Sequence, residues 1–216
     1  MAGSVEAESF RSLRQRMVDE DLRGRGIADE RVLQAMLHLP RHEFVPEAYR
    51  SQAYEDHPLP IGEGQTISQP YIVAIMVEAL ALQPTDSVLE VGAGSGYATA
   101  LLAEIATRVV AVERSAALAA GAAGILSGLG YNNVNVVVGD GSQGFAAGAP
   151  YDAILVSAAT AVVPQALIAQ LREDGGRMII PVGPAESQQL QLIRMQAGRA
   201  VVTLCGACRF VPLVSG

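Results

Sequence analysis

The chain has 216 residues, half of them hydrophobic, and 22 acidic residues against 15 basic ones give a formal net charge of −7. This length and apolar content allow a substantial core, which excludes an intrinsically disordered chain. The acidic balance argues against a protein that binds nucleic acid by neutralising phosphates. Every basic residue is an arginine, so lysine-based chemistry is excluded. No apolar run could span a membrane and no signal peptide is visible, so we expect a soluble, cytoplasmic monomer that binds neither membrane nor nucleic acid.

The first 60 residues carry all three histidines and read as a helical cap with loops, and residues 61–216 read as one compact domain. Asp29 is placed to cap a helix that ends before Pro40. Residues 62–69 read as a glycine-bearing loop. Pro70 then suits the first turn of a second helix, where its missing N–H does no harm.

From Ser87 onward, short apolar runs rich in β-branched residues alternate with helix-length segments. The runs suit strands buried on both faces and are residues 87–93, 108–113, 134–140, 151–159 and 176–183. The segments that suit helices are residues 96–106, 115–129 and 162–171. This alternation predicts a parallel sheet with helices on both sides. The short turn between residues 188–196 and 200–214 permits only an antiparallel pair. The expected fold is a doubly wound α/β domain, mostly parallel, with a C-terminal antiparallel hairpin.

The strand that begins near residue 87 runs into a turn with glycines at every second position, Gly92, Gly94 and Gly96. Such a turn alone fits a dinucleotide site, an S-adenosylmethionine site or merely a tight turn. The dinucleotide pattern requires a small residue where this chain has Tyr97. Glu90 would repel a pyrophosphate, whereas it would attract the ammonium and sulfonium groups of S-adenosylmethionine. The turn therefore favours the methyl donor over a dinucleotide.

Two further acids follow the next two predicted strands. Glu113 is spaced to accept both hydroxyls of an adenosine ribose, and Asp140 could accept from the adenine amino group, with Gly141 leaving room for the ring. Each acid also has a purely structural interpretation: Glu90 pairs with an arginine, Glu113 is solvated, and Asp140 forms a turn. The three acids end successive parallel strands, so we expect them to face one crevice.

At this point the chain resembles a known family, the protein-L-isoaspartate O-methyltransferases. The resemblance rests on residues 59–74, 88–103, 109–114, 139–141, 151–159, 175–183 and 209–214. Its most specific parts are the QTISQP segment and the C-terminal FVPL. The resemblance implies a Rossmann-like class I methyltransferase fold with S-adenosyl-L-methionine as cofactor. It implies transfer of a methyl group to the α-carboxyl of L-isoaspartyl residues in damaged proteins, which begins repair through a succinimide.

The resemblance also implies roles for individual residues. Ser68 matches the family's catalytic serine and would also contact the substrate. The cofactor would be contacted by Thr66, Ile67, Gln69, Tyr71, Glu90, Gly92, Gly94, Gly96, Glu113, Arg114, Asp140 and Gly141. The isoaspartyl peptide would be bordered by Val211, Pro212, Leu213 and Val214. No metal is expected, because the histidines and cysteines lack metal-ligand spacing.

The chemistry itself needs no general base, because a substrate carboxylate is already ionised near neutral pH. It needs alignment with the methyl carbon and removal of hydrating water. Ser68 suits this task as a donor of one hydrogen bond, although it could instead only cap the helix near Pro70. Three other functions stay open: methylation of a specific Asp in a modified peptide to form an aspartimide, non-catalytic S-adenosylmethionine binding, and NAD-dependent oxidation, which Tyr97 and Glu90 disfavour.

Overall fold

A computed structural model describes residues 2–215, with side chains described from residue 9 onward. Its centre is a seven-stranded sheet in the order β5-β4-β3-β6-β7-β8-β9. The strands are β3 (Ser87–Val91), β4 (Arg108–Glu113), β5 (Val134–Val138), β6 (Ala153–Val156), β7 (Arg177–Val182), β8 (Gln188–Gln196) and β9 (Arg199–Cys208). The first five are mutually parallel, and β8 and β9 form the antiparallel hairpin that the sequence predicts.

The helices are α1 (Ala2–Arg16), α2 (Glu30–His38), α3 (Pro70–Leu80), α4 (Tyr97–Ile105), α5 (Ala116–Gly128) and α6 (Gln165–Ile168). Asp29 caps α2, because its side chain accepts from the N–H of Arg31, and Pro70 opens α3, both as predicted. Around α2 lie a π-helical turn and short 3₁₀ turns, at Met17–Leu22, Arg23–Arg25, Arg41–Phe44 and Glu47–Gln52. Across residues 2–215, no helix is both long and apolar enough to cross a membrane.

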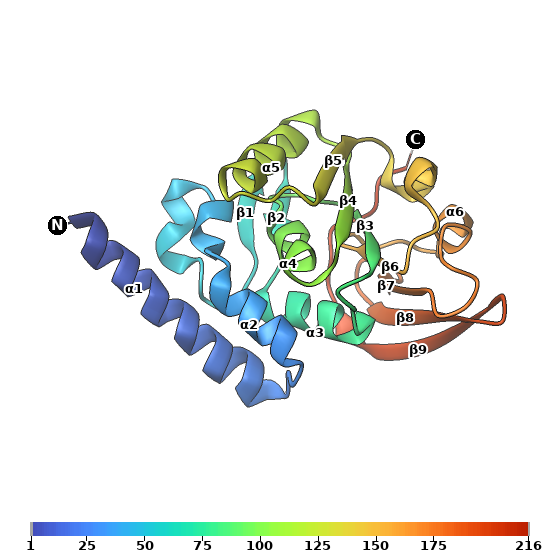
Figure 1. Cartoon of the computed structure of the whole chain (residues 1–216), viewed down its shortest axis with the longest axis horizontal. Helices are drawn as coiled ribbons and strands as arrows, with labels where there is room; N and C mark the ends of the chain where they lie inside the picture. Colours follow the sequence, from blue (N-terminus) through green and yellow to red (C-terminus); the bar gives the residue numbers. More distant parts are fainter. Residues whose placement is uncertain (1, 216) are drawn as a thin grey trace.

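Alternate residues of the parallel strands feed two hydrophobic clusters, one on each face of the sheet. Val88 and Val109 pack on the face covered by α3 and α4, whereas Leu89 and Val110 pack on the face that carries α6. Figure 1 shows α1 and α2 gathered towards one end of the molecule and the β8–β9 hairpin projecting at the other end. The fold is therefore doubly wound, as expected.

Three expectations about individual elements are wrong. The loop expected at residues 62–69 contains the second strand of a small antiparallel hairpin, which pairs β1 (Leu59–Gly62) with β2 (Gln65–Ile67). The helix expected at 162–171 is only the short α6, because Pro164 delays its start. The strand expected at 134–140 to be buried on both faces is β5, which is half-exposed because it is the edge of the sheet.

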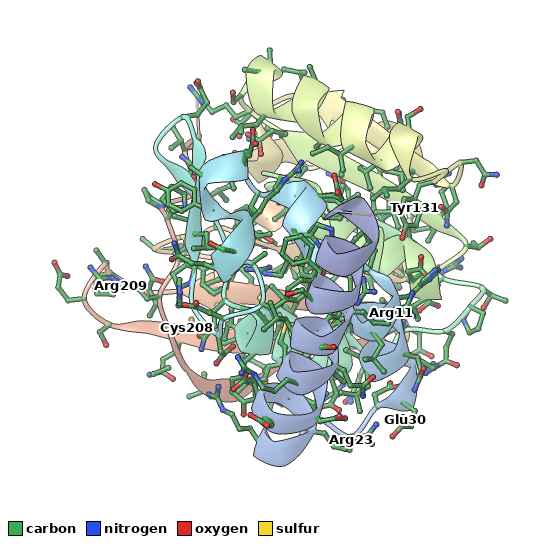
Figure 2. All side chains as sticks on the ribbon, turned by 90° about the vertical axis from the view of Figure 1, so that its left-hand side faces the viewer. Arg11, Arg23, Glu30, Tyr131, Cys208 and Arg209 are labelled. Carbon is green, nitrogen blue, oxygen red and sulfur yellow. The ribbon has the colours of Figure 1, made fainter. Side chains whose placement is uncertain are left out.

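The N-terminal residues share their core with the sheet domain. Met17, Leu33 and Phe44 belong to the same buried cluster as Leu101 and Ile179. Phe10 of α1 stacks on His42 with ring centroids 4.1 Å apart, and Figure 2 shows α1 lying across this side of the molecule. The boundary predicted after residue 60 falls inside β1, and the division into a cap and a domain stays a prediction.

Candidate active site

Two neighbouring cavities open where the strand order reverses between β3 and β6, the position at which open α/β sheets bind ligands. The strand-end cleft lies between the ends of β3, β4 and β6, the glycine after β5, and residues 211–214. The serine cleft contains Ser68 and Gln69 and extends to Arg209. Thr66, Ser157 and Val211 line both clefts, so ligands bound in the two would touch.

The glycine turn after β3 forms one wall of the strand-end cleft. Gly92, Gly94 and Gly96 all have positive φ angles, of 86°, 55° and 87°, which side chains disfavour. Gly92 and Gly94 line the cleft. Gly96 is not among the lining residues, and a Cβ there would lie 3.1 Å from the Cβ of Ala122 in α5. The absence of a side chain at Gly96 lets α5 pack closely.

Glu113 at the end of β4 is held by two backbone N–H groups. Its Oε2 accepts from Gly94 at 2.9 Å and its Oε1 accepts from Ser115 at 2.9 Å. A carboxylate has about four lone-pair positions, so two remain for the hydroxyls of a ribose. Arg114, the next residue, also lines the cleft and donates to the carbonyl of Val214 at 3.3 Å. This contact ties the C-terminal segment to the end of β4.

Gly141 lines the cleft near β5 and packs closely against Val91, another lining residue. A Cβ at Gly141 would lie 2.5 Å from Cγ1 of Val91. Asp140 is not among the residues that line the cleft, since its Oδ1 accepts from the backbone N–H and the hydroxyl of Ser142 at 2.9 and 2.7 Å. The side chain thereby caps the 3₁₀ turn Gly141–Gln143. A glycine wall and an acid with free acceptor positions fit a nucleoside cofactor.

Glu90 lies beneath the glycine turn and not in the cleft wall. Its side chain has no exposed surface, and its Oε2 accepts from the hydroxyl of Thr99 at 2.5 Å. Its Oε1 is buried and has no hydrogen-bond partner among the described residues. Burial raises the pKa of Glu90 to about 8, against the opposing effect of the Thr99 hydrogen bond. Glu90 is not among the residues that line the cleft, and its predicted contact with an ammonium group stays a prediction.

Asp56 anchors the segment that carries Ser68. Its Oδ1 accepts from the backbone N–H of Tyr71 at 3.0 Å, and its Oδ2 accepts from the side chain of Gln69 at 2.6 Å. Arg25 pairs with the same carboxylate and lies over the ring of Tyr71 at 3.5 Å. Tyr71 thus packs in this network, outside the lining of the two clefts. Gln69 lines the serine cleft, and Ile67 lies buried beside Ser68 in a smaller adjoining cavity.

Arg41 holds Ser68 from the interior. Its Nη2 donates to the carbonyl of Ser68 at 2.7 Å, and its Nε donates to the carbonyl of Ala53 at 2.8 Å. Its guanidinium lies 4.7 Å from the ring centroid of Tyr97 at the start of α4. The backbone at Ser68 is therefore connected to the helix that follows the glycine turn.

The structure brings most of the predicted residues together. Those that line the strand-end cleft are Thr66, Gly92, Gly94, Glu113, Arg114, Gly141, Val211, Pro212, Leu213 and Val214. Ser157, Arg41 and Asp56 were missed by sequence reasoning. Ser157 could have been found from its position after a parallel strand, whereas Arg41 and Asp56 lie in the cap and carry no recognisable spacing.

Comparison with known proteins gives the family. The model of the protein-L-isoaspartate(D-aspartate) O-methyltransferase family matches residues 12–216. A protein-L-isoaspartate O-methyltransferase of Koribacter versatilis is 56% identical over 99% of this chain and 96% of its own length. The chain belongs to the protein-L-isoaspartate(D-aspartate) O-methyltransferase family.

Other members of this methyltransferase family agree over nearly the whole chain. The protein-L-isoaspartate O-methyltransferase of Methanoculleus marisnigri is 53% identical, over 97% of this chain and 95% of its own. A structure described as a protein-L-isoaspartate O-methyltransferase of Plasmodium falciparum, in complex with S-adenosyl-L-homocysteine, has a TM-score of 0.80 and 26% identity. The match covers 96% of this chain and 99% of the Plasmodium falciparum chain. The expected class I methyltransferase fold is confirmed.

Proposed function

We propose that this methyltransferase transfers the methyl group of S-adenosyl-L-methionine to the α-carboxylate of L-isoaspartyl residues in damaged proteins. The resulting ester begins repair, because it closes to a succinimide that hydrolysis returns in part to normal aspartate. The observation that carries the proposal is the wall of Thr66, Ser157 and Val211 that the two clefts share. A methyl donor in the strand-end cleft and a carboxylate in the serine cleft would meet there.

The strand-end cleft binds the cofactor in this proposal. Gly92, Gly94, Glu113 and Gly141 would hold it, with Glu113 as an acceptor for its ribose hydroxyls. The bound cofactor supplies an electrophilic methyl group on a sulfonium. Glu90 acts from beneath the turn, by placing Thr99 and the start of α4.

Ser68 orients the acceptor carboxylate. Its hydroxyl donates one hydrogen bond to a carboxylate oxygen, and the apolar residues 210–214 limit hydration of that oxygen. No residue has to remove a proton, since the acceptor is ionised at neutral pH. Catalysis therefore rests on positioning and exclusion of water, which together supply several kcal/mol in favourable cases, on the order of 7–11 at most.

The test uses three peptides of one sequence that differ only at one residue: L-isoaspartyl, L-aspartyl or D-aspartyl. Each is incubated with the enzyme and methyl-labelled S-adenosylmethionine, and base-labile label is counted. We expect strong labelling of the isoaspartyl peptide and little of the L-aspartyl peptide. Equal labelling of these two, or no labelling of the isoaspartyl peptide, would contradict the proposal.

The monomeric state, the cytoplasmic location and the lack of membrane or nucleic-acid partners belong to the same proposal. The net charge of −7 supports the lack of these two kinds of partner, because an acidic protein is repelled by nucleic acid and by anionic lipid. Light scattering at several protein concentrations measures the oligomeric state directly. A mass that doubles with concentration would contradict the monomer.

A further inference from the structure

Arg209 stands in the wall of the serine cleft, directly after β9. Among the described residues that line this cleft it is the single charged one, and the remaining lining consists of hydroxyl, amide and apolar groups. Figure 2 labels Arg209 next to Cys208, where the C-terminal segment leaves the sheet edge. Its guanidinium therefore sets the sign of the local charge beside Ser68.

The charge of Arg209 is not neutralised within the described part of the chain, where its side chain has neither an ion pair nor a hydrogen bond. Arg25, Arg31 and Arg177 in contrast each pair with an aspartate. An unpaired cation in a chain of net charge −7 makes a local attraction for anions on a surface that otherwise repels them. A planar guanidinium also matches the two oxygens of a carboxylate.

The backbone that presents Arg209 is held firmly. The side chain of Gln188, which is buried, donates to the carbonyl of Phe210 at 3.1 Å and accepts from its N–H at 2.6 Å. Ala159 donates to the carbonyl of Val211 at 2.8 Å. The position of Arg209 at the cleft is thus fixed by its neighbours, whereas its own exposed side chain stays available to a ligand.

We infer that Arg209 is a specificity residue that recognises the negative charge of the methyl-accepting carboxylate. The inference rests on the proposed function and extends it to a residue outside the predicted site. The substrate enters as an anion, and methylation converts it to a neutral ester. Attraction to Arg209 therefore holds the substrate and disappears when the product forms, which favours release of the ester over release of the unreacted peptide.

The role lies in binding and not in the chemical step. A cationic donor and an anionic acceptor become neutral during transfer, so a strong fixed ion pair would stabilise the reactants more than the transition state. The exposed position of Arg209 keeps its attraction moderate, because water screens it. Loss of the charge should consequently raise KM for the peptide with little change in kcat.

The experiment compares Arg209→Gln with wild type and with Arg199→Gln. Arg199 is an exposed arginine at the opposite end of β9, so its variant removes the same charge at a distance from the cleft. We expect Arg209→Gln to raise KM for the isoaspartyl peptide about fivefold, with kcat changed less than about twofold. Arg209→Lys should recover part of the loss, and Arg199→Gln should match wild type.

A neutral competitor separates charge recognition from packing. An isoasparaginyl peptide carries an α-carboxamide in place of the carboxylate, and its inhibition constant should be equal for wild type and Arg209→Gln. Calorimetric affinity for S-adenosylhomocysteine should also be equal. An unchanged KM, a fall in kcat alone, or equal weakening of the neutral competitor would overturn the inference. Wild-type transfer to the isoaspartyl peptide, measured in the same assay, tests the proposed function separately.

Discussion

The guanidinium of Arg41 donates a hydrogen bond to the backbone carbonyl of Ser68, with 2.7 Å between Nη2 and the oxygen. Arg41 is completely buried and has no ion pair with any described residue, and burial lowers its pKa. A buried unpaired charge is costly for stability. Arg41 donates hydrogen bonds to Ser68 and Ala53 and lies over the ring of Tyr97. These contacts fix the loop of Ser68 against α4, which is the function that the buried charge serves.

Replacement of Arg41 should therefore impair catalysis without a direct loss of cofactor contacts. Arg41→Met removes both hydrogen bonds, and we expect kcat to fall about tenfold for the lost positioning of Ser68. Arg41→Lys retains the charge and a hydrogen-bond donor, so its kcat should fall less than that of Arg41→Met. Steady-state kinetics on variants shown to be folded by circular dichroism measure this. A folded Arg41→Met variant with normal kcat would refute the positioning role.

Ser68→Ala tests the oriented hydroxyl itself. We expect kcat to drop about tenfold, in line with loss of one hydrogen bond to an ionised group, while the dissociation constant for S-adenosylmethionine stays near the wild-type value. Isothermal titration and initial rates give the two quantities. Ser187→Ala, at an exposed serine, serves as control. Loss of cofactor affinity in Ser68→Ala would instead assign the serine to the cofactor.

Glu113→Ala should show the opposite pattern. It removes an acceptor in the strand-end cleft and frees the N–H groups of Gly94 and Ser115, so cofactor binding should weaken by about 1–3 kcal/mol. Calorimetry with S-adenosylhomocysteine measures the change. Glu173→Ala removes an exposed carboxylate elsewhere and should bind normally. Equal affinities of the two variants would show that Glu113 serves only the turn.

Glu90 should make stability depend on pH. Its pKa is about 8 in the folded protein against an ordinary value of 4.5, so the unfolded chain loses this proton first as pH rises. The folded state is therefore progressively destabilised as pH rises from about 4.5 to about 8. Glu90→Gln cannot ionise, so its melting temperature relative to wild type should rise between about pH 5 and about pH 8.5. A difference in melting temperature between the two proteins that stays the same at every pH in that range would contradict the raised pKa.

Two glycine substitutions should change stability in opposite directions. Gly141→Ala places a Cβ 2.5 Å from Val91, and we expect a loss of about 1–3 kcal/mol from overpacking. Gly121→Ala adds a methyl group on α5 with nothing within 4 Å and should stabilise by about 0.5–1 kcal/mol. Urea unfolding measures both. Equal effects would show that the close approach at Gly141 is relieved by movement of Val91.

The sequence was most informative where local chemistry decides the structure. The cap at Asp29, the start of α3 at Pro70 and the parallel strands all follow from residue type and periodicity. Glycine spacing located the cleft wall as well. It could not separate Gly92, which lines the cleft, from Gly96, which lies against α5, because only the position of the neighbouring helix distinguishes them.

The amino-acid sequence by itself determined the alternation of strands and helices, the glycine turn that favours a methyl donor, and the family. These features depend on residues that are neighbours along the chain. Only the tertiary structure decided which side chains reach the clefts. Glu90 is buried beneath the glycine turn. The carboxylate of Asp140 accepts hydrogen bonds from Ser142, and Arg41, which lies in the cap, donates to the carbonyl of Ser68. The physical reason is that burial and hydrogen-bond partners arise from residues distant in sequence, whose approach no local pattern records.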